Sequence, residues 1–328
     1  MMKKINIGVI GVGHMGEYHV RTYTEIIGVN LVGVMDIDEN RVKQVAQRYN
    51  TSAYTDYRDL LGKVDAVTIA VPTYLHYEVT KEFIEAGIHV LLEKPMTEDL
   101  NQAKELANIA ISKGIILKVG HVERFNAAAQ ELKNIVNNPI FIESRRLGPY
   151  NGRINDVGVT LDLLIHDIDI VLGLANSPVK ELNVAAKSIV SSFEDIVNVQ
   201  MVFKSGCMAN VTASRITENK VRTLAITQKG AYIYLDYANQ DLHIHRQATS
   251  KYILSREILR YKQESFIERI FVHKDNPLKL ELKDFIECIF TKDQSLDQLQ
   301  ENLKSLEITL HILDKINPKS AVNRKNEI

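Results

Sequence analysis

Short β-branched runs alternate with longer amphipathic segments through the first 120 residues, and this alternation restricts the possible folds more than any other feature. We expect strands at 5–10, 31–35, 66–71, 88–92 and 115–119. We expect helices between them at 14–27, 39–49, 73–86 and 97–114, the last with Thr97 as its N-cap. Strands that alternate with long helices predict βαβ units, a parallel sheet and right-handed crossovers. The N-terminal part should therefore be a doubly wound α/β domain.

The pattern changes after about residue 120. Tight turns at Lys204-Ser205-Gly206 and Gln228-Lys229-Gly230 separate short apolar runs, which predicts two hairpins and a mostly antiparallel, open sheet. Helices are expected at 125–136, 160–174, 278–290 and 295–316, with a further strand at 140–146. Because a chain of 328 residues exceeds the usual size of one core, we expect two domains, 1–121 (Rossmann type) and 122–328 (α+β).

Charge and cysteine content exclude several classes of protein. The chain has 40 basic and 41 acidic residues, a formal charge of −1, so no general attraction to nucleic acid is expected. No run approaches 18 apolar residues, and the N-terminus lacks a secretory signal, so we expect no membrane span. The two cysteines, Cys207 and Cys288, exclude a disulfide scaffold and indicate a reducing, cytoplasmic location.

A glycine-rich turn follows the first expected strand and opens the first helix. Gly11, Gly13 and Gly16 have the spacing G-x-G-x-x-G, and Val12, His14 and Met15 complete the turn. The first glycine permits the turn, the second lets backbone approach a pyrophosphate, and the third brings helix and strand together. The helix N-terminus then offers backbone N–H donors, including those of His14 and Met15, to phosphate. This context predicts dinucleotide binding.

Asp36 lies 20 residues beyond Gly16, at the end of the second expected strand. A carboxylate at this spacing bonds the ribose hydroxyls of NAD. Asp36 and Asp38 together would repel a 2′-phosphate, and the nearest arginine is Arg41. The expected cofactor is therefore NAD rather than NADP.

Glu93-Lys94-Pro95 ends another expected buried strand. Ligands of doubly wound sheets bind at the carboxyl ends of the strands, so Lys94 should lie at the site. Pro95 should restrict the backbone of Lys94, and a cis peptide bond is one way to do so. A lysine there could orient an alcohol or help to remove its proton. A lysine exposed at a strand end is the alternative interpretation.

Asp162, His166 and Asp169 share one face of a mostly apolar helix. A carboxylate that orients an imidazole suits proton transfer near neutral pH. A hydrogen-bonded core histidine and a metal pair are the alternatives, but no other residues have ligand spacing, so no metal site is predicted. His243 and His245 are interpreted as surface residues.

Taken in order, these motifs resemble the glucose–fructose oxidoreductase / inositol dehydrogenase (Gfo/Idh/MocA) family. The resemblance implies a Rossmann domain, NAD(P)-dependent oxidation or reduction of a sugar or cyclitol, and oligomer contacts through the C-terminal sheet, in a homodimer or homotetramer. It implies that Lys94 is the active-site lysine, His166 the general acid/base and Asp162 their support. The cofactor would lie along Val71, Pro72, Thr73, His76 and Glu93.

Two segments, 120–126 and 145–159, further resemble the UDP-N-acetylglucosamine 3-dehydrogenase branch, although Ala127 replaces a common proline. The branch oxidises C3 of the sugar to a ketone with NAD. Arginine forks suit a diphosphate. The expected substrate-binding residues are Lys94, Arg124, Asn126, Arg146, Arg153, Asp162 and His166, with Arg145 as a further basic residue of the cluster.

Three other functions stay open at this point. An inositol or free-sugar dehydrogenase of the same family would not need the arginines. A dinucleotide-sensing regulator would keep the fold without the chemistry, and the presence of Lys94 and His166 argues against it. An NAD-dependent glycosidase would use hydride transfer to trigger elimination, and it would release free sugar without net NADH.

Overall fold

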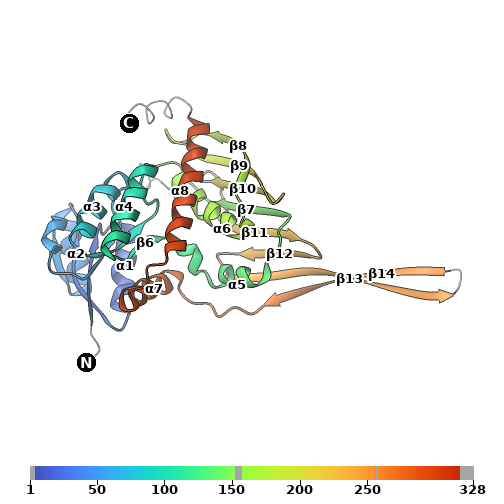
Figure 1. The fold of residues 1–328 in the computed structure, drawn as a ribbon, viewed down its shortest axis with the longest axis horizontal. Helices are drawn as coiled ribbons and strands as arrows, with labels where there is room; N and C mark the ends of the chain where they lie inside the picture. The colour runs from blue at the N-terminus through green and yellow to red at the C-terminus, as the bar shows by residue number, and fades with distance from the viewer. Residues whose placement is uncertain (1–3, 152–156, 256–257, 318–328) are drawn as a thin grey trace. The chain divides into compact units, whose positions relative to one another are not determined.

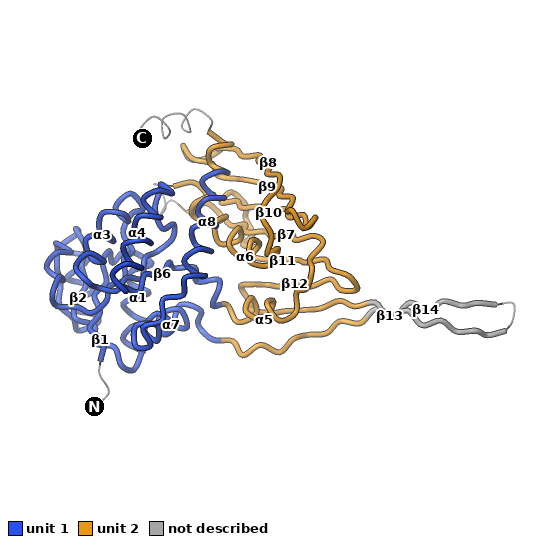
Figure 2. Tube along the Cα trace, viewed as in Figure 1, with its two compact units in different colours: residues 1–125, 275–311 blue, residues 126–274, 312–328 orange. Residues whose placement is uncertain are grey.

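The computed structural model describes residues 4–151, 157–255 and 258–317. The chain divides into two compact units, shown in different colours in Figure 2. Unit 1 comprises residues 1–125 and 275–311, and unit 2 comprises residues 126–274 and 312–328. The sequence predicted two domains with one boundary after residue 121. The structure also has two units, but residues 275–311 belong to unit 1.

Unit 1 is built on a six-stranded sheet in the order β3-β2-β1-β4-β5-β6. All its neighbouring strands run parallel, as predicted. The strands are β1 (Ile5–Ile10), β2 (Val29–Met35), β3 (Ser52–Tyr54), β4 (Ala66–Ile69), β5 (His89–Glu93) and β6 (Leu117–Gly120). Strands β2 and β3 are added on one side of β1, and strands β4 to β6 on the other. Doubly wound sheets bind their ligands at this switch point between β1 and β4.

The helices of unit 1 follow the expected alternation (Figure 1). They are α1 (His14–Thr24), α2 (Glu39–Tyr49), α3 (His76–Glu85), α4 (Leu100–Lys113) and α7 (Pro277–Thr291), with 3₁₀ turns η1 (Tyr57–Leu60), η2 (Thr73–Leu75) and η3 (Val122–Phe125). Helix α8 (Leu296–Ile316) belongs to unit 1 up to residue 311.

Thr97 does not cap α4, contrary to the sequence prediction. The cap is Asp99, whose carboxylate accepts the N–H groups of Asn101 at 2.7 Å and Gln102 at 3.0 Å. The Thr97 hydroxyl instead donates to the backbone oxygen of Asp99. An aspartate within reach of two free N–H groups and of the positive end of the helix dipole is the stronger cap.

Helix α7 joins the core of unit 1 although it lies more than 150 residues beyond the other parts of that core. Its apolar face (Leu278, Leu282, Phe285 and Ile286) packs in one cluster with buried residues of β1, α1 and α2. This burial explains why the second domain is not continuous from 122 to 328. The helix pattern at 278–290 was read correctly from the sequence, but its partner was not.

Unit 2 carries an eight-stranded sheet in the order β14-β13-β12-β11-β7-β10-β9-β8. All neighbours are antiparallel except β7 and β10, which confirms a mostly antiparallel sheet. The strands are β7 (Phe141–Leu147), β8 (Val179–Lys187), β9 (Ile196–Phe203), β10 (Met208–Ser214), β11 (Val221–Gln228), β12 (Ala231–Asp236), β13 (Asp241–Ser255) and β14 (Ile258–Ile270).

The helices of unit 2 are α5 (Ala127–Ile135) and α6 (Ile165–Ala175), and α6 packs on β7 and β10. The sequence predicted one continuous helix over 160–174. A π-helical turn, η4 (Thr160–Leu164), instead leads into α6. Such turns insert an extra residue per turn and occur mostly at functional sites. None of the helices in the described ranges combines the length and the apolar character needed to cross a membrane.

Candidate active site

The glycine turn at the end of β1 has the geometry that a pyrophosphate site requires. Gly11 has φ +82°, and a Cβ there would lie 2.5 Å from the Ala70 oxygen. A Cβ at Gly16 would lie 1.8 Å from the Gly11 oxygen, so this position brings helix and turn into contact. A Cβ at Gly13 would meet no protein atom within 4 Å. The space beside Gly13 is therefore open to a ligand, next to the N-terminus of α1.

Asp36 follows β2 at the same edge of the sheet, and its side chain turns toward the glycine loop. One carboxylate oxygen accepts the Val12 N–H at 3.0 Å, and the other accepts the Asp38 N–H at 3.0 Å. Arg41 lies 3.3 Å from both oxygens. These bonds hold the carboxylate beside the loop, in the position expected of a ribose ligand.

The segment after β4 contains Val71, Pro72, Thr73 and His76. The His76 ring lies between two backbone carbonyl oxygens, those of Pro95 at 2.7 Å and Val71 at 2.9 Å. Its side chain is 1% exposed, and burial lowers its pKa against the effect of the two carbonyls. The expected cofactor contact of the His76 side chain is thus not what this geometry favours. The ring connects the turn after β4 to the segment after β5.

Glu93 ends β5 and Lys94 follows it, at the same carboxyl edge of the sheet as the glycine turn, with β4 between β1 and β5. The Lys94–Pro95 peptide bond is cis, as considered from the sequence. Glu93 is buried and bonds the His19 ring at 2.8 Å. Burial is the largest influence and raises the pKa of Glu93, but the hydrogen bond to His19 and the charges of His19, Lys94 and His76 together outweigh it, so the net shift of the pKa is downward. Glu93 is therefore a buried carboxylate held by α1.

In unit 2, Asp162 lies in the π turn and His166 in the first turn of α6, both half-buried. Asp169 is buried on the same helix. Asp167, which the sequence analysis passed over, is 1% exposed and bonds Arg146 at 2.6 Å and Ser144 at 2.7 Å. The residue next to His166 thus fastens α6 to strand β7.

Three expected substrate residues have partners inside the protein. Arg146 is 2% exposed and its guanidinium is held by Asp167, so it is not available to a diphosphate. Asn126 is 2% exposed; its amide caps α5 and donates to the Tyr237 oxygen at 3.0 Å. Arg124 pairs with Glu301 at 3.3 Å, within unit 1. Buried polar groups need partners, and the fold supplies them for these three residues, whose contact with a substrate stays a prediction.

The other two arginines of the expected cluster are Arg145 and Arg153. Arg145 points away from Arg146 by strand alternation, is exposed, and pairs with Glu143 at 2.7 Å. Arg153 lies outside the described residues. Within those residues, no group of three or more histidine, cysteine or acidic side chains could hold a metal ion.

Comparison with known proteins gives two family matches. Residues 5–121 match the Gfo/Idh/MocA oxidoreductase family with an NAD-binding Rossmann fold, and residues 141–233 match the Gfo/Idh/MocA C-terminal domain. Among curated proteins, UDP-N-acetylglucosamine 3-dehydrogenase of Acidithiobacillus ferrooxidans is 31% identical over 286 residues, 83% of this chain and 91% of that protein. The scyllo-inositol 2-dehydrogenase (NAD(+)) of Bacillus subtilis is 24% identical over 310 residues, 88% of this chain and 87% of that protein.

Solved structures agree with these matches. The Acidithiobacillus ferrooxidans UDP-N-acetylglucosamine 3-dehydrogenase superposes with a TM-score of 0.84 at 30% identity, covering 95% of this chain and 97% of that one. A levoglucosan dehydrogenase in complex with NADH has a TM-score of 0.80 at 17% identity, covering 95% and 96%. At that identity the second likeness concerns the fold alone.

Proposed function

This chain belongs to the Gfo/Idh/MocA oxidoreductase family, and we propose that its substrate is UDP-N-acetylglucosamine, oxidised at C3 to the 3-keto sugar. The chain is an NAD-dependent sugar dehydrogenase at the level of the family. The observation that carries the finer proposal is the 31% identity to a UDP-N-acetylglucosamine 3-dehydrogenase across 91% of that protein, with a TM-score of 0.84. The inositol dehydrogenase is less similar, at 24%.

The residues of unit 1 fit a bound NAD. Open space at Gly13 and the free N-terminus of α1 suit the pyrophosphate, and Asp36 suits the ribose hydroxyls. The exposed Ile37 side chain, 85% exposed directly after Asp36, offers an apolar surface for the adenine base. When bound, NAD supplies the hydride acceptor of the reaction.

The proposed chemistry assigns one task to each polar side chain. His166 accepts the proton of the sugar hydroxyl while hydride leaves the same carbon. Lys94, at the carboxyl end of β5, stabilises the negative charge that develops on the oxygen. Asp162 orients the imidazole of His166.

Turnover of UDP-N-acetylglucosamine with NAD tests the proposal. Absorbance at 340 nm should rise, and the sugar product should carry a ketone at C3. Turnover with inositol but with no nucleotide sugar would refute the choice of substrate while leaving the family activity intact.

A cyclitol or free-sugar dehydrogenase is the second candidate, and one observation favours it. Arg146 and Asn126 are buried with partners inside unit 2, and Arg124 pairs with Glu301, so the expected diphosphate site loses most of its donors. Inhibition by UDP alone separates the two candidates. UDP should compete with a nucleotide sugar but leave the turnover of a free cyclitol unchanged.

We further propose a cytoplasmic homodimer or homotetramer that assembles through the sheet of unit 2. Sedimentation equilibrium of the purified chain tests its assembly. A monomer at micromolar concentration would refute it.

A further inference from the structure

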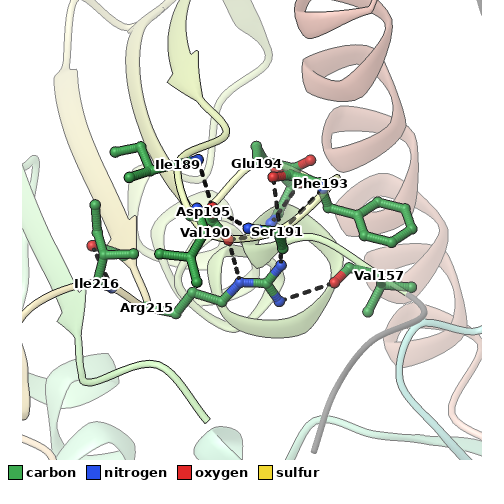
Figure 3. A network of polar contacts seen from close by, with 11 residues as sticks. Val157, Ile189, Val190, Ser191, Phe193, Glu194, Asp195, Arg215 and Ile216 are labelled. Atoms are coloured by element: carbon green, nitrogen blue, oxygen red, sulfur yellow. Dashed lines mark hydrogen bonds and ion pairs between the residues drawn. The ribbon is translucent and has the colours of Figure 1, made fainter. Parts of the chain in front are cut away.

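The first turn of the helix that carries Asp162 and His166 is held by a buried polar network (Figure 3). The network joins the loop before β9 to the chain that enters the helix. Its charged members are Glu194, Asp195 and Arg215, which are 4%, 0% and 6% exposed. All of its members belong to unit 2.

Glu194 contacts the start of the π turn twice. Its carboxylate accepts the Thr160 N–H at 3.1 Å, and its backbone oxygen accepts the Val159 N–H at 3.0 Å. Gly158 makes room for the carboxyl group, because a Cβ there would lie 2.2 Å from it. Glu194 therefore satisfies two of the N–H groups that every helix start leaves without a partner, with a carboxylate at the positive end of the dipole.

Arg215 links Val157, which lies just before the π turn, to the loop before β9. Its guanidinium donates to the Val157 oxygen at 3.1 Å, to the Asp195 carboxylate at 2.8 Å and to the Ser191 hydroxyl at 2.6 Å. Figure 3 shows the guanidinium between Val157 and Asp195. Because Asp195 directly follows Glu194, the arginine also restrains the backbone of Glu194.

Asp195 fixes the backbone of the loop before β9. One of its oxygens accepts three consecutive backbone N–H groups, those of Ile189, Val190 and Ser191, at 2.6–3.0 Å. Burial alone would raise the pKa of Asp195, but these bonds and Arg215 hold it well below its ordinary range. The three backbone N–H groups and the buried ion pair with Arg215 thus favour the ionised form of Asp195.

We propose that Glu194 and Arg215 are positioning residues that hold the π turn and so determine the direction of Asp162 relative to His166. If the turn relaxed to an ordinary α-helix, residues at its start would rotate by one position, about 100°. A carboxylate that orients an imidazole does not tolerate such a rotation. This inference rests on the proposed roles of Asp162 and His166.

The test compares Glu194→Ala with Glu194→Gln, whose amide oxygen can still accept the Thr160 N–H. The alanine variant should lose about 100-fold in kcat, the cost of a misplacement near 1 Å. Its pH profile for kcat should shift, and its Kd for NAD should stay within about twofold of wild type, since NAD binds unit 1. The glutamine variant should keep kcat within about threefold of wild type, because it preserves the helix cap.

Arg215→Met should resemble Glu194→Ala, and Arg246→Met is the matched control. Arg246 forms a half-exposed ion pair with Glu268 at 3.0 Å in the same unit, so its loss should leave kcat and the pH profile unchanged. Equal losses in the alanine and glutamine variants would overturn the proposal. So would an alanine variant that is folded and has wild-type kcat and pH profile.

Hydrogen exchange separates this inference from the proposed function. Amides of residues 157–166 should exchange at least about tenfold faster in Glu194→Ala than in wild type or Glu194→Gln, as expected when a local cap is lost. Faster exchange without any sugar turnover in the wild type would overturn the proposed function but keep the positioning role in the turn. Unchanged exchange would overturn the positioning role itself.

Discussion

Replacing Glu281 with glutamine is expected to stabilise the protein at neutral pH and to remove part of its pH dependence. Glu281 lies on α7, is 1% exposed, and neither carboxyl oxygen has a hydrogen-bond partner among the described residues. It lines a cavity of about 20 Å³ together with Asn302, whose amide oxygen also lacks a partner there. This cavity has room for about one water molecule.

The surrounding charges do not neutralise the Glu281 carboxyl group. Lys118 pairs with Asp284, and Arg124 pairs with Glu301, so both nearby cations have anionic partners of their own. Burial, with the Glu93 carboxylate as a second cause, raises the pKa of Glu281 well above its ordinary value of 4.5. The folded protein therefore holds the proton of Glu281 more tightly than the unfolded chain does.

The sign and size of the effect follow from this difference. Above pH 4.5 the unfolded chain gains stability by ionising Glu281, so the free energy of unfolding decreases as pH rises. While Glu281 stays protonated in the folded protein, the decrease is about 1.4 kcal/mol for each pH unit. Between pH 5 and 7 the decrease is at most about 3 kcal/mol. Glutamine is neutral in both states and has no such dependence.

Chemical denaturation at pH 5, 6 and 7 measures the effect. The unfolding free energy of Glu281→Gln minus that of wild type should grow as pH rises, by at most about 3 kcal/mol over this range. Glu287→Gln, an exposed position on the same helix, is the control and should follow wild type. A constant difference between Glu281→Gln and wild type would refute the reasoning, because Glu281 would then be ionised in the folded protein too.

Three further predictions concern the cofactor and the chemistry. Gly13→Ala should fold normally, because its Cβ meets no protein atom, but should raise the Kd for NAD at least about tenfold in a fluorescence titration. An unchanged Kd would remove Gly13 from the pyrophosphate site. Asp36→Ser, with Arg41 retained 3.3 Å from the former carboxylate, should shift the ratio of kcat/KM toward NADP by about tenfold or more; continued rejection of NADP would show that another residue selects the cofactor. Lys94→Ala and His166→Ala should each abolish turnover in the 340 nm assay while NAD binding persists. Wild-type turnover in either variant would exclude that residue from catalysis, and absence of turnover in the wild type would favour a dinucleotide-sensing regulator.

The cofactor half of the site was predictable because its signals are local. Gly11, Gly13 and Gly16 follow a strand and open a helix, and each glycine has its reason within the turn itself. Asp36 and Lys94 end parallel strands, so the alternation of strands and helices alone places them at one edge of the sheet. Their positions at that edge needed no knowledge of side-chain packing.

On the substrate half, residue type did not reveal the distant partners that the fold supplies. The sequence offered Arg146 as a diphosphate ligand, but Asp167 binds it inside unit 2. Asn126 has the composition of a polar contact residue and serves as a buried helix cap. His19, which bonds Glu93 across 74 positions, carried no local signal at all.

The sequence by itself determined the two kinds of sheet, the glycine turn, the place of Asp36 after β2 and the helical segment that carries Asp162 and His166, since periodicity and spacing act over a few residues. Only the tertiary structure decided that α7 completes the core of unit 1, that a π turn begins the His166 helix, and that Glu194 and Arg215 hold it. These outcomes depend on pairs of groups far apart in the chain, which burial brings together and obliges to satisfy one another.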